Sequence, residues 1–170
     1  MRKLAALLMC AVVFICSGCS AGKPLTPSEY KVELQTIWEK WCSNTTGCVM
    51  LIPADNDDPQ FFEKLGQNYP EAKEYFKVLE ECYSDFEILV PPEEYREYQR
   101  DIVVGVKHER VWLGYIKQLF ESDDMQEFNE IADKITEQFD SIAGSGTYDG
   151  ETLPSAYARV YLKLKEDGVE

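Results

Sequence analysis

Apolar residues recur every three or four positions along most of the chain after residue 26, and this spacing is the strongest constraint on its fold. Such spacing puts the apolar side chains on one face of an α-helix, where packing against other helices removes them from water. The clearest pattern follows a typical cap at Ser122-Asp123-Asp124 and consists of Met125, Phe128, Ala132, Ile135, Phe139 and Ile142. We therefore predict an all-α protein.

The first of these helices has a strong start signal at Thr26-Pro27-Ser28-Glu29. A threonine can act as the N-cap, a proline suits the first helical position, and Glu29 can complete a capping box. The apolar face of this helix would consist of Tyr30, Leu34, Ile37, Trp38 and Trp41. We expect this face to be buried.

The chain between residues 41 and 70 has weaker signals. Trp41–Cys48 includes Gly47, which tolerates a positive backbone angle, so we predict a small loop there. Val49–Ile52 would form a short buried extended piece. Pro59–Gly66 would form a brief helix before the chain restarts at Pro70.

Prolines and glycines divide the rest of the chain into longer helices. These are expected from about Pro70 to Leu89, from Pro92 to about Glu121, from Met125 to Ile142, and from Pro154 onward. Gly105 and Gly114 each lower helix propensity by about 1 kcal/mol, which indicates close approach of another helix or a bend. The pattern predicts an antiparallel helical bundle of about four main helices plus a short one, in one domain covering residues 26–170.

The chain is strongly acidic, with 31 Asp and Glu residues against 17 Lys and Arg and a formal charge of −14. A surface of this sign repels phosphate backbones and anionic lipid headgroups. We therefore expect no nucleic-acid partner, and the net charge also disfavours docking to a membrane through a polybasic surface.

The N-terminus has the three parts of an export signal in the usual order. The basic pair Arg2-Lys3 precedes the apolar run Leu4–Ile15, which is followed by the small residues Ser17-Gly18. A membrane-spanning helix needs about 20 apolar residues, and this run is shorter. The sequence therefore favours a cleaved signal over a permanent transmembrane helix.

The end of this segment, Ile15-Cys16-Ser17-Gly18-Cys19-Ser20, resembles the lipobox of bacterial lipoproteins. The resemblance implies that residues 1–18 are a signal peptide and that Cys19 receives a diacylglyceryl group. It departs from the family at Cys16, where leucine is usual. Residues 19–25 would then be the lipidated cysteine and a short tether, and the protein would be held at the cell membrane on its extracytoplasmic face. An ordinary secretory signal followed by a free cysteine is the alternative.

Three cysteines remain in the expected domain: Cys42, Cys48 and Cys82. Export permits disulfides, and Cys42 and Cys48 flank the predicted loop, so they are the first candidates for a pair. Cys82 could compete for either partner. The alternative is three reduced thiols, with Cys82 filling a core position of its helix.

Candidate catalytic and metal-binding residues are few. His108 is the only histidine and has no ligand-type residue one turn away, so a surface or interhelical hydrogen bond is favoured over metal binding or general-base catalysis. A thiol nucleophile would have to combine Cys42 or Cys82 with His108, and no local motif supports this. We expect neither metal nor cofactor.

Acidic and tyrosine-rich segments are also weak evidence for a site. The run Asp55-Asn56-Asp57-Asp58 suggests a calcium loop, but Gln60 and Gly66 stand where an EF-hand needs its glycine and its bidentate glutamate. Acidic pairs such as Glu80-Glu81 read as solvated helix faces, although two carboxylates can hydrolyse glycosides. The tyrosines within residues 94–100 could form a recognition surface or cover the rim of the core.

These observations favour a membrane-anchored, non-catalytic binding or accessory module of the cell envelope, whose partner is an envelope protein or component. The alternative is an envelope enzyme, such as a wall hydrolase that uses carboxylates. A small ligand held inside the bundle is a third hypothesis.

Overall fold

The computed structural model describes residues 23–144 and 152–169, and for residues 139–144 it describes the backbone alone. The expected signal peptide, Cys19 and residues 20–22 lie outside the described residues. So do the side chains of Phe139 and Ile142 and most of the loop expected between residues 144 and 150.

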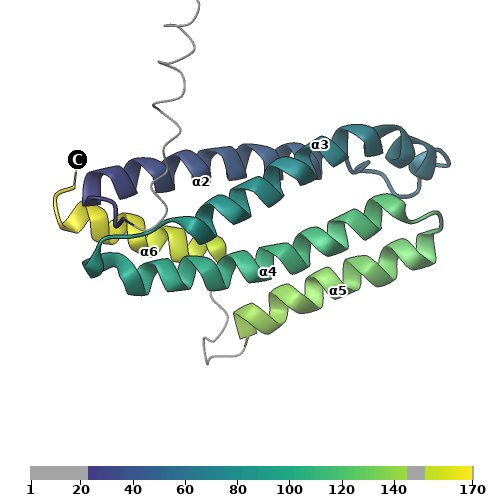
Figure 1. Cartoon of the computed structure of the whole chain (residues 1–170). Helices are drawn as coiled ribbons and strands as arrows, with labels where there is room; N and C mark the ends of the chain where they lie inside the picture. Colours follow the sequence, from purple (N-terminus) through teal and green to yellow (C-terminus); the bar gives the residue numbers. More distant parts are fainter. Residues whose placement is uncertain (1–22, 145–151, 170) are drawn as a thin grey trace, which may run out of the picture.

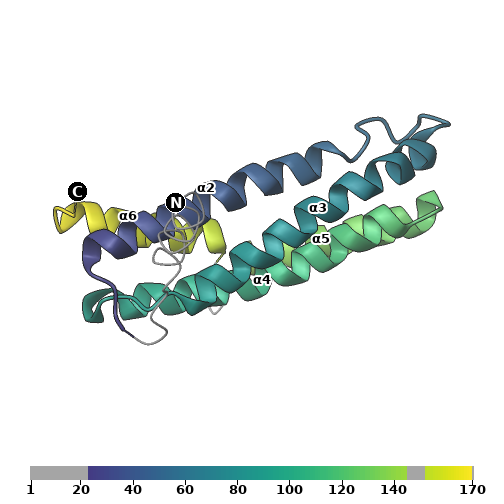
Figure 2. The same cartoon turned by 45° about the horizontal axis from the view of Figure 1, so that its top comes forward.

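The described residues form an all-α bundle and contain no strand, which confirms the predicted fold class (Figure 1). Its elements are α2 (Pro27–Met50), α3 (Phe61–Ile88), the 3-10 helix η1 (Glu93–Tyr95), α4 (Arg96–Glu121), α5 (Met125–Gly144) and α6 (Leu153–Glu166). Successive helices from α2 to α5 alternate in direction, as Figure 1 and Figure 2 show.

Helix α4 is the common packing partner in this bundle. It contacts α3, α5 and α6, whereas α2 packs mainly on α3 and α6. Helices α5 and α6 follow one another along α4, so that each covers a different half of it (Figures 1 and 2). The two halves of α4 therefore have different neighbours and meet where α6 begins.

Helix starts agree with the cap signals in the sequence. The backbone N–H of Glu29 donates to Thr26 Oγ1 at 3.3 Å, and the Glu29 carboxylate accepts from the N–H of Thr26 at 2.8 Å, which completes the capping box. At the start of α5 the N–H of Glu127 donates to Asp124 Oδ1 at 2.9 Å. These bonds satisfy N–H groups that have no partner within their own helix.

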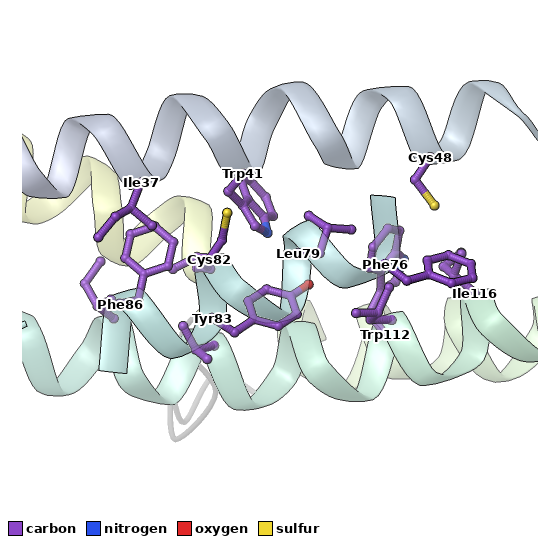
Figure 3. Packing of buried hydrophobic residues seen from close by; sticks show 14 of the residues in the cluster. Ile37, Trp41, Cys48, Phe76, Leu79, Cys82, Tyr83, Phe86, Trp112 and Ile116 are labelled. Carbon is purple, nitrogen blue, oxygen red and sulfur yellow. The ribbon is translucent and has the colours of Figure 1, made fainter. Parts of the chain in front are cut away.

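The core lies between α2, α3, α4 and α6, and Figure 3 shows part of it. Its largest fully buried side chains are Tyr30, Tyr83, Tyr95, Phe61, Phe86, Leu34, Leu65, Leu79, Ile102, Leu113, Leu153 and Leu164. At one end, Tyr30 donates to buried Gln99 at 2.7 Å, and Gln99 donates to the carbonyl of Phe86 at 2.5 Å. This network joins three helices and satisfies polar groups that burial would otherwise penalise.

Gly105 lies at the closest approach of two helices, as its position in the sequence suggested. A Cβ atom at Gly105 would lie 2.5 Å from the backbone nitrogen and 2.6 Å from the Cα of Leu153, the first residue of α6. No side chain fits there unless the backbone moves. A Cβ at Gly114, by contrast, would have nothing within 4 Å.

The predictions for residues 41–52 are wrong, because residues 41–50 continue α2 and residues 51–52 form a turn after it. Gly47 is helical, and a Cβ there would lie 2.7 Å from the ring of Tyr75, so this glycine serves helix packing instead of a turn. Val49 and Met50, expected to be buried, are 44% and 79% exposed.

The separate short helix expected at Pro59–Gly66 is also wrong, because α3 runs without a break from Phe61 to Ile88 and contains Pro70. Proline removes one hydrogen bond from a helix and crowds the preceding turn. Buried Leu65 and Phe76 lie on either side of it, so burial of one continuous face outweighs that loss.

The described helices are too polar to act as membrane spans: none contains a stretch long and apolar enough to cross a bilayer.

We predict that Gly105→Ala destabilises the fold and that Gly114→Ala does not. The added methyl at residue 105 collides with the backbone of α6, and such overpacking costs about 1–3 kcal/mol. At residue 114 there is open space, so the higher helix propensity of alanine should add about 0.5–1 kcal/mol. Urea unfolding of both variants measures these changes. Equal effects on the free energy of unfolding would contradict the assigned contact.

Candidate functional site

The three cysteines of the domain are free thiols in the structure, and the expected Cys42–Cys48 pair is not formed. Both residues lie on α2, six positions apart, which separates them by about 9 Å along the helix axis. A disulfide needs Cα atoms within about 7 Å, so this pairing would require α2 to unwind.

Burial makes these thiols poor nucleophiles. It raises the pKa of Cys48 and of Cys82 to about 11 and raises the pKa of Cys42 as well. A thiol with a raised pKa holds little of the reactive thiolate at neutral pH. Cys82 is fully buried, so it occupies the core position that was the alternative to pairing.

His108 is half-buried on α4, and its backbone carbonyl accepts a hydrogen bond from Gln138 Nε2 of α5 at 3.1 Å. It belongs to no group of metal-ligating side chains within the described residues. One acidic group there has the right spacing, namely Asp123, Asp124 and Glu127, but it is exposed and Asp124 caps α5. These contacts identify no metal site.

The acidic segments singled out in the sequence are used in local structure. Asp55 accepts from the N–H of Asp57 at 3.1 Å, and Asp58 accepts from the N–H of Gln60 at 2.8 Å and pairs with Lys64. On α3, Glu80 forms ion pairs with Arg110 and with Lys117 of α4, the latter at 3.1 Å. Such contacts are typical of solvated turns and helix faces.

The tyrosines of residues 94–100 do not gather at the surface. Tyr95 is 1% exposed, stacks on Tyr30 with ring centroids 5.9 Å apart, and donates to Asp167 at 2.9 Å. An aromatic row lies instead between α2 and α6, where Trp38 stacks on Tyr157 at 4.0 Å and Tyr157 stacks on Tyr161 at 5.9 Å. Tyr161, at the outer end of this row, is 38% exposed.

The most unusual group beside the core is the carboxyl of half-buried Glu109. The apolar residues of α4 that face the core occupy positions 102, 106, 113, 116 and 120, and position 109 completes that alternating spacing of four and three. Glu109 therefore lies on the core face of α4, in the middle of an otherwise apolar stripe. Glu109 was not among the candidate residues predicted from the sequence.

Glu109 lies beside Tyr83 of α3, and Trp41 of α2 lies near the Tyr83 hydroxyl. The Tyr83 hydroxyl donates to the Glu109 backbone carbonyl at 3.4 Å, which is a long hydrogen bond. The indole N–H of Trp41 lies close enough to the same hydroxyl to lower its pKa, although it makes no hydrogen bond of normal geometry. Figure 3 shows Trp41 of α2 and Tyr83 of α3 facing one another in the core.

Burial raises the pKa of Glu109 from its ordinary value of 4.5 to about 7. The cause is desolvation, since an apolar environment penalises the charged carboxylate. Burial also raises the pKa of Tyr83. A carboxyl that titrates near neutral pH can give or take a proton in a cell, which makes Glu109 the best candidate in the described chain for acid–base chemistry.

A shallow open groove of about 430 Å³ lies on the other side of α4. It is lined by Pro91, Arg96, Gln99, Arg100, Val103, Val104 and Lys107. Since each residue advances a helix by about 100°, Glu109 lies roughly half a turn around α4 from Arg100 and Lys107. The proton-exchanging carboxyl and the groove therefore do not form one site.

We predict that Glu109→Gln stabilises the protein at pH 8 and has little effect near pH 4.5. The pKa of Glu109 is about 7 in the folded chain and near 4.5 when exposed. Between pH 4.5 and pH 7 the folded chain therefore holds a proton on Glu109 that the unfolded chain has lost. Stability should fall across that window by up to about 1.4 kcal/mol per pH unit, and glutamine removes this loss.

Glu97→Gln on the same helix is the matched control, because Glu97 is exposed. Urea unfolding at several pH values measures both variants against the wild type. The same pH dependence in the Glu97 and Glu109 variants would rule out the assigned burial of Glu109.

The chain matches no protein-family model, no curated protein and no solved structure. Its function must therefore be argued from its own residues.

Proposed function

We propose that the protein is a lipid-anchored, non-catalytic binding module of the cell envelope, held at the extracytoplasmic face of the membrane through Cys19. The lipobox-like segment that ends at Cys19 supports the anchor, and the basic pair and apolar run before it support export. Two acyl chains give stable attachment where one gives marginal binding.

The observation that carries the proposal is that the folded domain begins only a few residues after Cys19. The backbone N–H of Leu25 donates to the carbonyl of Val90 at 3.0 Å, and Thr26 caps α2 directly afterwards. Leu25 follows Cys19 by six positions, and a fully extended chain of this length spans about 20 Å. A lipid on Cys19 would therefore hold this end of the bundle close to the membrane, as expected for an anchored domain on a short tether.

A binding role fits the chemistry of the described residues better than catalysis does. The buried thiols are protonated at neutral pH, and the carboxyl of Glu109 faces the core instead of the groove. The row formed by Trp38, Tyr157 and Tyr161 reaches the surface between α2 and α6. Aromatic rings that reach a polar surface often contribute much of the energy of recognition.

An envelope hydrolase is the second candidate, and one observation favours it. A carboxyl with a pKa of about 7, as at Glu109, suits the general acid of a glycoside hydrolase. Release of soluble fragments from purified cell wall by the wild type, with a loss of about 100-fold or more in Glu109→Gln, would favour this candidate. No release by either protein would favour the binding module.

We predict that Cys19→Ser moves the protein from the membrane fraction to the soluble fraction of the envelope, because the hydroxyl cannot receive the diacylglyceryl group. Mass spectrometry of the wild type should find an N-terminal peptide that begins at Cys19 and carries acyl chains. The control is Cys42→Ser, which keeps the expected anchor. An N-terminus that retains Met1, or equal membrane retention of the two variants, would contradict the proposal.

A further inference from the structure

The outer face of α4 carries positive charge in a chain whose net charge is −14. Arg96, Arg100 and Lys107 are all exposed and line the groove described above. Arg96 pairs with Glu93 at 2.7 Å. Within the described residues, neither Arg100 nor Lys107 has an acidic partner within 4 Å, so both retain their charge for another ligand.

This face is amphipathic as well as cationic. Val103 and Val104 lie half-buried between the three cations, and Val111, one turn beyond Lys107, is 49% exposed. Pro91 also lines the groove. Cationic side chains above a shallow apolar floor suit a surface that offers phosphates next to hydrocarbon.

The other sides of α4 are covered by the bundle. Helix α3 meets α4 through Glu80 and Arg110, α6 meets it at Gly105, and α5 meets it through the bond from Gln138 to the carbonyl of His108. The angular spacing of residues along the helix puts Arg100 and Lys107 on the side away from Gly105. The cationic face therefore points to solvent.

The groove also lies at the end of the bundle where the tether enters. Leu25 is bonded to Val90, and Pro91, the next residue, lines the groove. Cys19 is about 20 Å of extended chain from Leu25. An anchor at Cys19 would therefore keep this end of the groove close to the membrane.

We propose that the cationic face of α4, formed by Arg96, Arg100, Val103, Val104 and Lys107, binds the phosphates of anionic lipid headgroups in the membrane that anchors the protein. This inference rests on the lipid anchor of the proposed function and adds an oriented contact to it. The groove volume of about 430 Å³ is large enough for a headgroup. Arginine and lysine both bind phosphate oxygens through charge-assisted hydrogen bonds.

The acidic net charge does not exclude this contact, because salt screens charges over about 8–10 Å. Beside the groove, Glu93 already pairs with Arg96 at 2.7 Å, and Glu94 is exposed. On α4 itself, Asp101 forms an ion pair with Arg159 at 2.7 Å, and Glu97 borders the face. A basic segment near a membrane gains about 1 kcal/mol per cation, which corresponds to about a fivefold gain in affinity.

Lysine labelling on vesicles tests the inference with the intact lipidated chain. The mature protein is reconstituted into phosphatidylcholine vesicles with or without phosphatidylglycerol, and acetylation of each lysine is followed by mass spectrometry. We expect phosphatidylglycerol to slow the acetylation of Lys107 at least threefold and high salt to restore it. Lys165 is the internal control, because it is exposed near the same end of the bundle but lies on α6.

A charge-matched pair of variants sharpens the test. Arg100→Gln should raise the fraction of phosphatidylglycerol needed for half-protection of Lys107 about fivefold. Lys77→Gln removes the same charge from an exposed position on α3 and should leave that fraction unchanged. Equal shifts in the two variants would show a general effect of net charge and would overturn the inference.

The remaining outcomes separate this inference from the anchor. Protein that floats with both kinds of vesicle but labels Lys107 equally in both would overturn the cationic face and leave the anchor standing. Protein that floats with neither would overturn both. Protection of Lys107 by inorganic phosphate on phosphatidylcholine vesicles, equal to that by phosphatidylglycerol, would assign the groove to a free anion instead of a lipid.

Discussion

The stripe of α4 that faces the core is the constraint on which the rest of the structure depends. Helices α3, α5 and α6 all pack on α4. Helix α6 can approach α4 closely because Gly105 has no side chain. Ile102, Val106, Leu113, Ile116 and Phe120 keep this stripe apolar, and only Glu109 interrupts it. A carboxyl in this position couples the stability of the bundle to pH, because burial penalises its ionised form.

Local signals in the sequence predicted the structure well wherever a local interaction decides it. The capping box at Thr26, the cap at Asp124 and the helix stop at Pro91-Pro92 are all present, because each depends on neighbouring residues alone. The local signals predicted the wrong structure where packing between distant residues decides it. Gly47 suggested a turn, but its missing side chain makes room for the ring of Tyr75, and burial of one long face keeps α3 helical through Pro70. Single-sequence reasoning has no access to such contacts.

Only part of the candidate site could be predicted from the sequence. The gap that Glu109 fills in the apolar spacing of α4 is visible in the sequence, and a stricter count of that spacing would have found it. The contacts of Tyr83 with Glu109 and with Trp41 could not be predicted, because they depend on how far three helices slide past one another. The cationic groove was hidden for another reason: a net charge of −14 describes the sum of all faces and says nothing about one of them.

An anchor and a cationic face together would fix how the domain lies on a membrane. The groove runs along α4, so binding through it would set the long axis of the bundle along the surface instead of upright on its tether. Helix α2 packs mainly on α3 and α6, so it would lie on the side away from the lipid. The aromatic row of Trp38, Tyr157 and Tyr161 would then face outward. In that orientation the rings between α2 and α6 would stay accessible to an envelope partner.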